Sequence, residues 1–294
     1  MDMIHESEFE LPARDGYPLS AKVFLPEAPK AAVLISSGTG FPKELYARFA
    51  RYGAERGYAT LIYDYRGIAG SAPEEMDGFD ADILDWGRQD FPAALDAAAG
   101  FAPGKPLFTL GHSVGGHLLG LADNIDRVAA HGFVTVGTGY YGAHHWSYTP
   151  NALFFWWGYG PACLALKNYI PAGGLWGGTA LPRAVFEQWR RWSQRPDYFA
   201  AFYDEIGEHV YDKISAPIRS WTFSDDRLCT QRAADDLLRA YSAAPREHLR
   251  LSPRELGAKR IDHHGAFSRS AKGFWEKPFN WFDAVLDPSS ESAP

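Results

Sequence analysis

A serine in a tight, glycine-rich turn is the first residue whose surroundings suggest chemistry. Ser113 lies in Gly111-His112-Ser113-Val114-Gly115, which has the pattern G-x-S-x-G, between an apparent buried strand and an apparent helix. A side chain at either glycine would collide with the neighbouring strand or helix, so we expect a strained turn that projects the serine hydroxyl. In this strand-turn-helix context the pattern predicts a nucleophilic serine at a nucleophile elbow; without the context it would fit an incidental serine.

A serine hydroxyl is a weak nucleophile at neutral pH and needs a base, which an acid must orient. For a serine in such a turn, the expected order along the chain is serine, then acid, then histidine. Asp225 and Asp226 follow an apolar run that ends at Phe223, and His263 and His264 follow a later run. Both pairs sit where loops are expected, so the order matches. One residue of register decides which carboxylate faces the imidazole, so the residues alone leave both pairs open.

The elements that must position these residues alternate between strand and helix. Short, nearly continuous apolar runs are typical of parallel strands covered on both faces, and helical periodicity fills the segments between them. Expected strands are an N-terminal hairpin around Asp15 and Gly16, followed by 31–37, 58–65, 106–110, 128–136, 218–223 and 248–251. Expected helices are 43–57, 83–99, 114–123, 232–241 and 272–286. This alternation predicts an α/β fold with a mostly parallel eight-stranded sheet flanked by helices.

Residues 140–216 interrupt the alternation. They show little strand signal and carry many large aromatic residues, including Trp156, Trp176 and Trp189. We expect residues 1–139 and 217–294 to form the core domain, and 140–216 to form an inserted cap or lid. Such an insertion would cover the carboxyl ends of the strands, where open α/β sheets bind ligands. For any single ring, packing is the simpler expectation than ligand contact.

Composition limits the class of protein. The chain of 294 residues has a formal net charge of −7, which argues against a surface for nucleic acid or anionic membranes. The N-terminus shows no signal peptide, and no run is long enough to span a membrane. We therefore expect a cytoplasmic protein without nucleic-acid partners, and an irregular C-terminal tail, DPSSESAP. The sequence leaves open whether the chain forms a homo-oligomer.

Cysteine and histidine usage predicts neither a disulfide framework nor a metal site. The two cysteines, Cys163 and Cys229, are isolated and fit a reducing compartment. The adjacent histidines at 144–145 and 263–264 have no third ligand at a suitable spacing. We expect no metal and no cofactor.

Four pieces of the sequence carry a resemblance to a known family. They are SSGTGFPKELY, YDYRGIAGSAP, GHSVGGH, and the pair SDDRLCT with IDHHGAF, and together they span the expected sheet domain, about Ala31 to Phe267. The chain resembles the α/β-hydrolase superfamily, and within it bacterial serine hydrolases of the serine aminopeptidase and monoacylglycerol lipase-like group. The resemblance implies the α/β-hydrolase fold, and its motifs identify no substrate.

The resemblance also implies roles for individual residues. Ser113 matches the nucleophile. The family's acid is the last aspartate of a G-x-x-D after a strand, which selects Asp226, and its base precedes a glycine by two residues, which selects His263. Phe223 stands where the family has that glycine, so Asp225 stays open as the acid.

The oxyanion hole of such enzymes uses two backbone N–H groups, one after the nucleophile and one in the loop after the third strand. These are Val114 and, in SSGTG, Thr39, with Gly40 as the second choice. Ser37 and Gly38 stand where most of the superfamily has His-Gly. Because the donors belong to the backbone, this change is tolerable.

Together these features predict a serine hydrolase that cleaves a carboxylic ester of a small-to-medium apolar substrate through an acyl-enzyme. Thioesters and amides are alternatives, and the partner is a small-molecule acyl substrate. An acyltransferase with the same triad is a second hypothesis. A catalytically silent ligand-binding protein of the same fold is a third, and a complete set of serine, acid and histidine argues against it.

Overall fold

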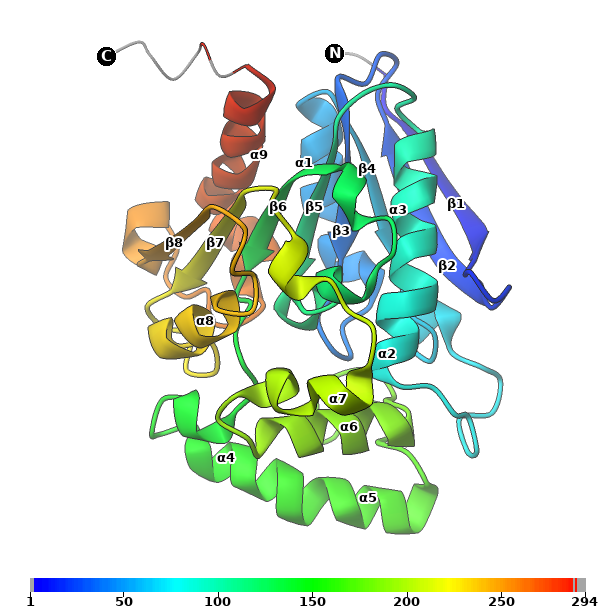
Figure 1. The fold of residues 1–294 in the computed structure, drawn as a ribbon, viewed down its shortest axis with the longest axis vertical. Coiled ribbons are helices and arrows are strands. Elements are labelled where there is room, and N and C mark those ends of the chain that lie inside the picture. The colour runs from blue at the N-terminus through cyan, green and yellow to red at the C-terminus, as the bar shows by residue number, and fades with distance from the viewer. Residues whose placement is uncertain (1–2, 288, 290–294) are drawn as a thin grey trace.

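The computed structural model describes residues 3–287 and 289 and shows one sheet with helices on both faces (Figure 1). The eight strands lie in the order β1-β2-β4-β3-β5-β6-β7-β8. β1 pairs with β2 and β2 with β4 in antiparallel fashion, and the other neighbours are parallel. The strands are β1 His5–Pro12, β2 Pro18–Leu25, β3 Ala31–Ser36, β4 Tyr58–Tyr63, β5 Leu107–His112, β6 Val128–Val134, β7 Ile218–Phe223 and β8 Arg246–Leu251. The expected mostly parallel eight-stranded sheet is confirmed.

The central strands are apolar on both faces because each face supports its own core. Along β3, Leu34 belongs to one core, whereas Val33 and Ile35 belong to the other. This period of two is the geometry of a strand. The core around Val33 includes residues of α1 and α9, and the core around Leu34 includes residues of α3 and α8. The α-helices are α1 Ala47–Glu55, α2 Ile83–Asp85, α3 Phe91–Gly100, α4 Thr149–Phe154, α5 Gly160–Lys167, α6 Arg183–Ser193, α7 Tyr203–Ile206, α8 Gln231–Leu238 and α9 Lys272–Leu286.

The helix expected over 114–123 is wrong. Two short 3-10 turns, Ser113–Gly116 and Leu119–Leu121, occupy this stretch instead. Close packing explains the difference, because a Cβ at Gly120 would lie 2.2 Å from the ring of Tyr211. Glycines that this packing requires are poor helix formers, so the segment makes isolated turns.

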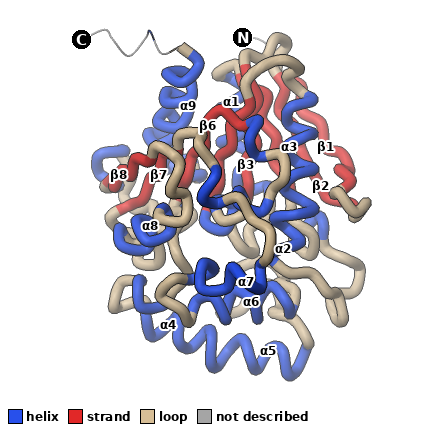
Figure 2. Tube along the Cα trace, in the orientation of Figure 1, coloured by secondary structure: helices blue, strands red, loops and turns tan. Residues whose placement is uncertain are grey.

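Residues 140–216 form a layer of helices and loops, which we call the inserted segment (Figure 2). It contains α4 to α7, and a five-residue π-helical stretch, Phe155–Tyr159, lies between α4 and α5. Outside the eight named strands, its one β-bridge within the described residues joins Ile170 to Leu181. The segment lies at the end of the sheet where Ser113 is found, since both line one cavity. The division into core and cap domains stays a prediction.

The C-terminal tail, expected to be irregular, is described only in part. Its residues 288 and 290–294 lie outside the described residues. Within 3–287 and 289, no helix combines the length and apolar character that crossing a bilayer requires.

Candidate active site

Ser113 occupies the strained turn that its glycines predict. Its φ is +50°, in the left-handed region that side chains rarely adopt. A Cβ at Gly111 would lie 2.6 Å from the carbonyl carbon of Gly115, and one at Gly115 would lie 2.5 Å from the carbonyl oxygen of Ser36. Both contacts involve backbone, which cannot move aside. The two glycines therefore allow the turn to pack against β3 while it holds the serine at the end of β5.

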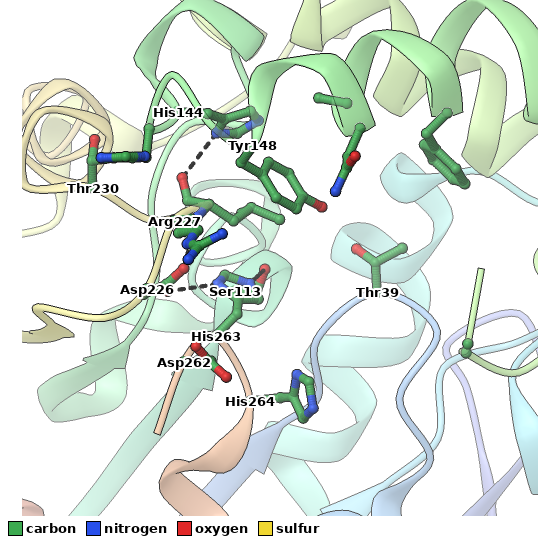
Figure 3. Close-up of a pocket in the computed structure, with 18 of the residues that line it drawn as sticks. Thr39, Ser113, His144, Tyr148, Asp226, Arg227, Thr230, Asp262, His263 and His264 are labelled. Atoms are coloured by element: carbon green, nitrogen blue, oxygen red, sulfur yellow. Dashed lines mark hydrogen bonds and ion pairs between the residues drawn. The ribbon is translucent and has the colours of Figure 1, made fainter. Parts of the chain in front are cut away.

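Three predicted residues meet through side-chain hydrogen bonds (Figure 3). Ser113 Oγ lies 3.0 Å from His263 Nε2, and His263 Nδ1 lies 2.8 Å from Asp226 Oδ2. The residues follow β5, β8 and β7, whose carboxyl ends meet at one edge of the sheet. Asp226 Oδ1 accepts the amides of Leu228 at 2.8 Å and Cys229 at 3.0 Å, which fixes the carboxylate. The arrangement can deprotonate a hydroxyl.

Asp226 is held in its ionised form. Burial by itself raises the pKa of this carboxyl. The charge of His263, its hydrogen bond, and the amides of Cys229 and Leu228 lower the pKa, and together they outweigh burial. The resulting pKa lies below the ordinary value. An ionised, hydrogen-bonded carboxylate keeps the proton of the imidazole on Nδ1, so Nε2 is free to accept the serine proton.

The alternative residues, Asp225 and His264, face elsewhere. Asp225 Oδ2 accepts the amides of Ile261 at 2.8 Å and Asp262 at 3.1 Å, and so holds the loop that carries His263. The ring of His264 packs against Phe41, with centroids 5.2 Å apart. Burial, followed by the charge of His263, lowers the pKa of His264. Of each pair, the structure brings Asp226 and His263 to the serine.

Sequence reasoning missed a buried chain of hydrogen bonds behind this site. The amide of Gly38 donates to the Tyr46 hydroxyl at 2.8 Å, and this hydroxyl lies 2.6 Å from His112 Nδ1. His112 Nε2 lies 2.9 Å from the carbonyl oxygen of His263, which can only accept. His112 therefore carries its proton on Nε2 and accepts from Tyr46 at Nδ1. Burial, followed by the charge of His263, lowers the pKa of His112 to about 3, so the ring stays neutral.

This chain joins the Ser37–Gly40 loop to the loop of His263. A Cβ at Gly38 would lie 2.7 Å from His112 Nδ1, so glycine is needed where the loop meets the ring. The x position in G-x-S-x-G is the available sequence signal for His112. Its partner lies 66 positions away in the chain, and no local pattern connects the two.

The two residues predicted for the oxyanion hole are Thr39 and Val114. Thr39 lines the same cavity as Ser113, and Val114 follows Ser113 in the turn. Within the described part of the chain, the amide of Thr39 donates to no backbone or side-chain acceptor. It is therefore available to a substrate oxygen.

Ser113, Asp226 and His263 line a cavity of about 1400 Å³. One wall comes from the inserted segment and carries aromatic residues such as Phe155, Trp176 and Trp189. The other comes from loops after β7 and β8. Among residues 3–287 and 289, no group of three or more histidine, cysteine or acidic side chains is placed to hold a metal ion.

Comparisons with known proteins agree with the fold. The sequence model of the serine aminopeptidase family (S33) matches residues 27–168. A search of curated protein sequences finds no match. Similar solved structures include a hypothetical protein from Pseudomonas aeruginosa, with 20% identity over 96% of this chain and 94% of that chain and a TM-score of 0.61. A soluble variant of monoglyceride lipase from Saccharomyces cerevisiae, in complex with a substrate analog, gives 14% identity over 98% and 95%, with a TM-score of 0.63. An esterase from Pyrococcus furiosus gives 12% over 95% and 92%, with a TM-score of 0.56.

At these identities the solved structures establish a shared fold. The family match covers the part of the chain that contains β3, β4, β5 and the serine turn. Together with the neighbours it supports a hydrolase. Residues 27–168 are thus similar to the serine aminopeptidase family, and the whole chain shares the α/β-hydrolase fold with these solved structures.

Proposed function

We propose that the protein hydrolyses carboxylic esters through an acyl-enzyme on Ser113. The hydrogen-bonded chain from Ser113 through His263 to Asp226, at the mouth of a large cavity, carries this proposal. The distances of 3.0 Å and 2.8 Å suit transfer of the serine proton to His263 as the oxygen attacks.

The mechanism follows from where each group lies. His263 Nε2 accepts the proton of Ser113 Oγ, and Asp226 stabilises the imidazolium. The amides of Val114 and Thr39 stabilise the tetrahedral oxyanion. The imidazolium then returns its proton to the leaving alcohol as the carbon–oxygen bond breaks. Water, deprotonated by the same imidazole, attacks the acyl-enzyme and releases the acid.

The inserted segment acts as a cap in this proposal. Its rings supply an apolar wall opposite the triad, with Phe155 stacked on Trp176 at 5.3 Å and Trp156 edge-on to Trp189 at 4.7 Å. Such rings bury a large apolar area with few polar demands. This favours an apolar acyl group of small to medium size.

The test is hydrolysis of phenyl esters of graded acyl length by the native chain and by Ser113→Ala. We expect measurable turnover by the native chain and a loss on the order of 10⁴-fold or more in kcat for the variant, because the nucleophile is gone. Equal turnover by both proteins would contradict the proposal, and no turnover by the native chain would favour a silent binding protein.

Adding methanol separates hydrolysis from acyl transfer, since a product that is mainly methyl ester would identify an acyltransferase.

A further inference from the structure

Three basic side chains, which we call the basic wall, line the part of the cavity formed by β8 and by the loops after β7 and β8. Arg227 lies in the loop after β7, Arg250 in β8, and Lys259 in the loop after β8. All three are exposed. Among the residues that the structure describes, none of the three forms an ion pair, and Arg250 has only a 3.4 Å hydrogen bond to the carbonyl of Ser224.

The carboxylates that line the same cavity are engaged elsewhere. Asp226 bonds His263 and two backbone amides, Asp225 accepts two amides, and Asp262 pairs with Arg260. The lining therefore holds four cationic side chains against three carboxylates, in a chain whose net charge is −7. The wall is locally basic on a protein that is acidic as a whole, which favours an anion over a cation there.

The chemistry sets which end of the substrate meets this wall. The imidazolium of His263 must reach the leaving oxygen, so the alcohol part of the ester lies on the side of His263. Lys259 lies on the loop that carries His263, and Arg227 directly follows Asp226. Figure 3 shows Arg227 together with Asp226 and Ser113 at the cavity. The basic wall therefore faces the alcohol side and leaves the aromatic wall to the acyl side.

We propose that the alcohol part of the substrate carries an anionic group, a carboxylate or a phosphate, bound by Arg227, Arg250 and Lys259. The acyl part is apolar and lies against the aromatic wall. This inference deepens the proposed function and rests on it. Guanidinium and ammonium groups bind carboxylate and phosphate through charge-assisted hydrogen bonds, and a guanidinium such as that of Arg227 can make two of them in parallel.

The test compares two esters that differ in one charge: 4-carboxyphenyl hexanoate and 4-(methoxycarbonyl)phenyl hexanoate. The measured quantity is the ratio of their kcat/KM values, charged over neutral. We expect Arg227→Ala to lower this ratio about tenfold or more relative to the native chain, since one lost charge-assisted contact of about 1.4 kcal/mol is a factor of ten. Lys259→Glu should lower it too, and Arg227→Lys should retain most of it. Added salt should lower the native ratio because exposed charges are screened.

Arg254→Ala is the matched control, because Arg254 is exposed in the turn Pro253–Leu256 and does not line the cavity. Its ratio should equal that of the native chain. A ratio that neither Arg227→Ala, Lys259→Glu nor salt changes would overturn the inference. A second pair, mono-4-nitrophenyl adipate and 4-nitrophenyl hexanoate, carries the charge on the acyl part; dependence on Arg227 in this pair alone would overturn the assignment to the alcohol side.

The same assay keeps the two proposals apart. Turnover of the neutral ester, and its loss in Ser113→Ala, measures the proposed function, whereas the ratio measures the inference. If no ester is turned over, both proposals are wrong. Inhibition of neutral-ester hydrolysis by benzoate and by phenyl phosphate distinguishes carboxylate from phosphate, and inhibition by neither would count against an anion site.

Discussion

Asp225 and Asp226 are neighbours in the chain, yet their carboxylates bond different partners. Asp226 bonds His263, and Asp225 bonds the amides of Ile261 and Asp262. One carboxylate therefore orients the imidazole, while the other holds the loop that carries it. Substitutions of the two aspartates therefore compare a direct effect on the imidazole of His263 with an indirect effect through its loop.

Asp226→Asn should lower kcat for a neutral ester by on the order of 10⁴-fold, because the amide no longer holds the imidazole in the tautomer that accepts the serine proton. Asp225→Asn should cost far less, since its target is the backbone of the loop. Steady-state kinetics of both variants at the same pH measures the contrast. Equal losses, or a larger loss for Asp225→Asn, would contradict these roles of the two carboxylates.

At this scale the sequence predicted some residues and could not predict others. Ser113 could be predicted because Gly111 and Gly115 lie beside it in the chain, and the tight turn requires glycine at both positions. The choice of Asp226 over Asp225 came from family resemblance, since periodicity cannot fix a register of one residue after a strand. His112 was missed because its function depends on Tyr46, which only the folded sheet brings within 2.6 Å.

Among the elements, the turn before α1 and strand β5 are connected through Tyr46 and His112. Tyr46 ends the 3-10 turn Lys43–Tyr46, and His112 ends β5. Tyr46 also accepts the amide of Gly38, and His112 also bonds the carbonyl of His263. The three hydrogen bonds connect the expected oxyanion loop to the loop of His263. This makes Tyr46 a positioning residue for both loops.

Tyr46→Phe should leave the buried Nδ1 of His112 and the amide of Gly38 without their partner. We expect a loss of about 1–3 kcal/mol in the free energy of unfolding and a lower kcat with little change in KM. Chemical denaturation and ester kinetics measure the two effects. Tyr52→Phe on α1 is the control, because among the described residues the Tyr52 hydroxyl has only a 3.4 Å hydrogen bond from Arg56. A variant that loses stability but keeps its kcat would show that the chain is structural alone.

The strands were predicted well because short apolar runs between turn-forming residues are typical of strands covered on both faces. β7 and α9 have the expected bounds. The helix expected over 114–123 was wrong because its glycines serve packing against residues distant in sequence, such as Tyr211. The aromatic content of the inserted segment is visible in the sequence. The positions of its helices could not be predicted, because they depend on packing that hydrophobic periodicity does not show.

The molecule as a whole places its two cores on the two faces of one sheet, and it buries several histidines there. His131 in β6 is fully buried; its Nδ1 lies 2.8 Å from Thr109 Oγ1, and its Nε2 has no partner among the described residues. Burial lowers the pKa of His131 to about 3, against an ordinary value of 6.5. The folded chain therefore holds this ring neutral over a range in which the unfolded chain protonates it.

The sign of the pH effect follows from this difference. As pH falls from about 6.5 toward 3, the unfolded state binds a proton that the folded state does not, so the free energy of unfolding falls. In His131→Leu this contribution is absent. Relative to the variant, the native chain should lose about 1.4 kcal/mol per pH unit below pH 6. Urea denaturation of both proteins between pH 7 and about 4.5 measures the difference, and a pH-independent difference would contradict the buried neutral ring.

The sequence predicted the fold class of the whole molecule, but it did not predict how charged side chains are distributed around the cavity. Alternation of strand and helix predicts the sheet, and the positions of Ser113, Asp226 and His263 after predicted strands place them at its carboxyl edge. The basic wall was not foreseen, because Arg227, Arg250 and Lys259 belong to no common sequence motif and only the folded chain brings them to the lining of one cavity.

The proposed mechanism depends most on Ser113 forming a covalent bond with its substrate. The direct measurement is mass spectrometry of the chain after reaction with a fluorophosphonate, with peptide mapping of the adduct and Ser113→Ala and His264→Ala as comparison proteins. We expect one phosphonyl group on Ser113 in the native chain and in His264→Ala, and none in Ser113→Ala. An adduct on another residue, or an unmodified native chain beside a labelled control esterase, would contradict it.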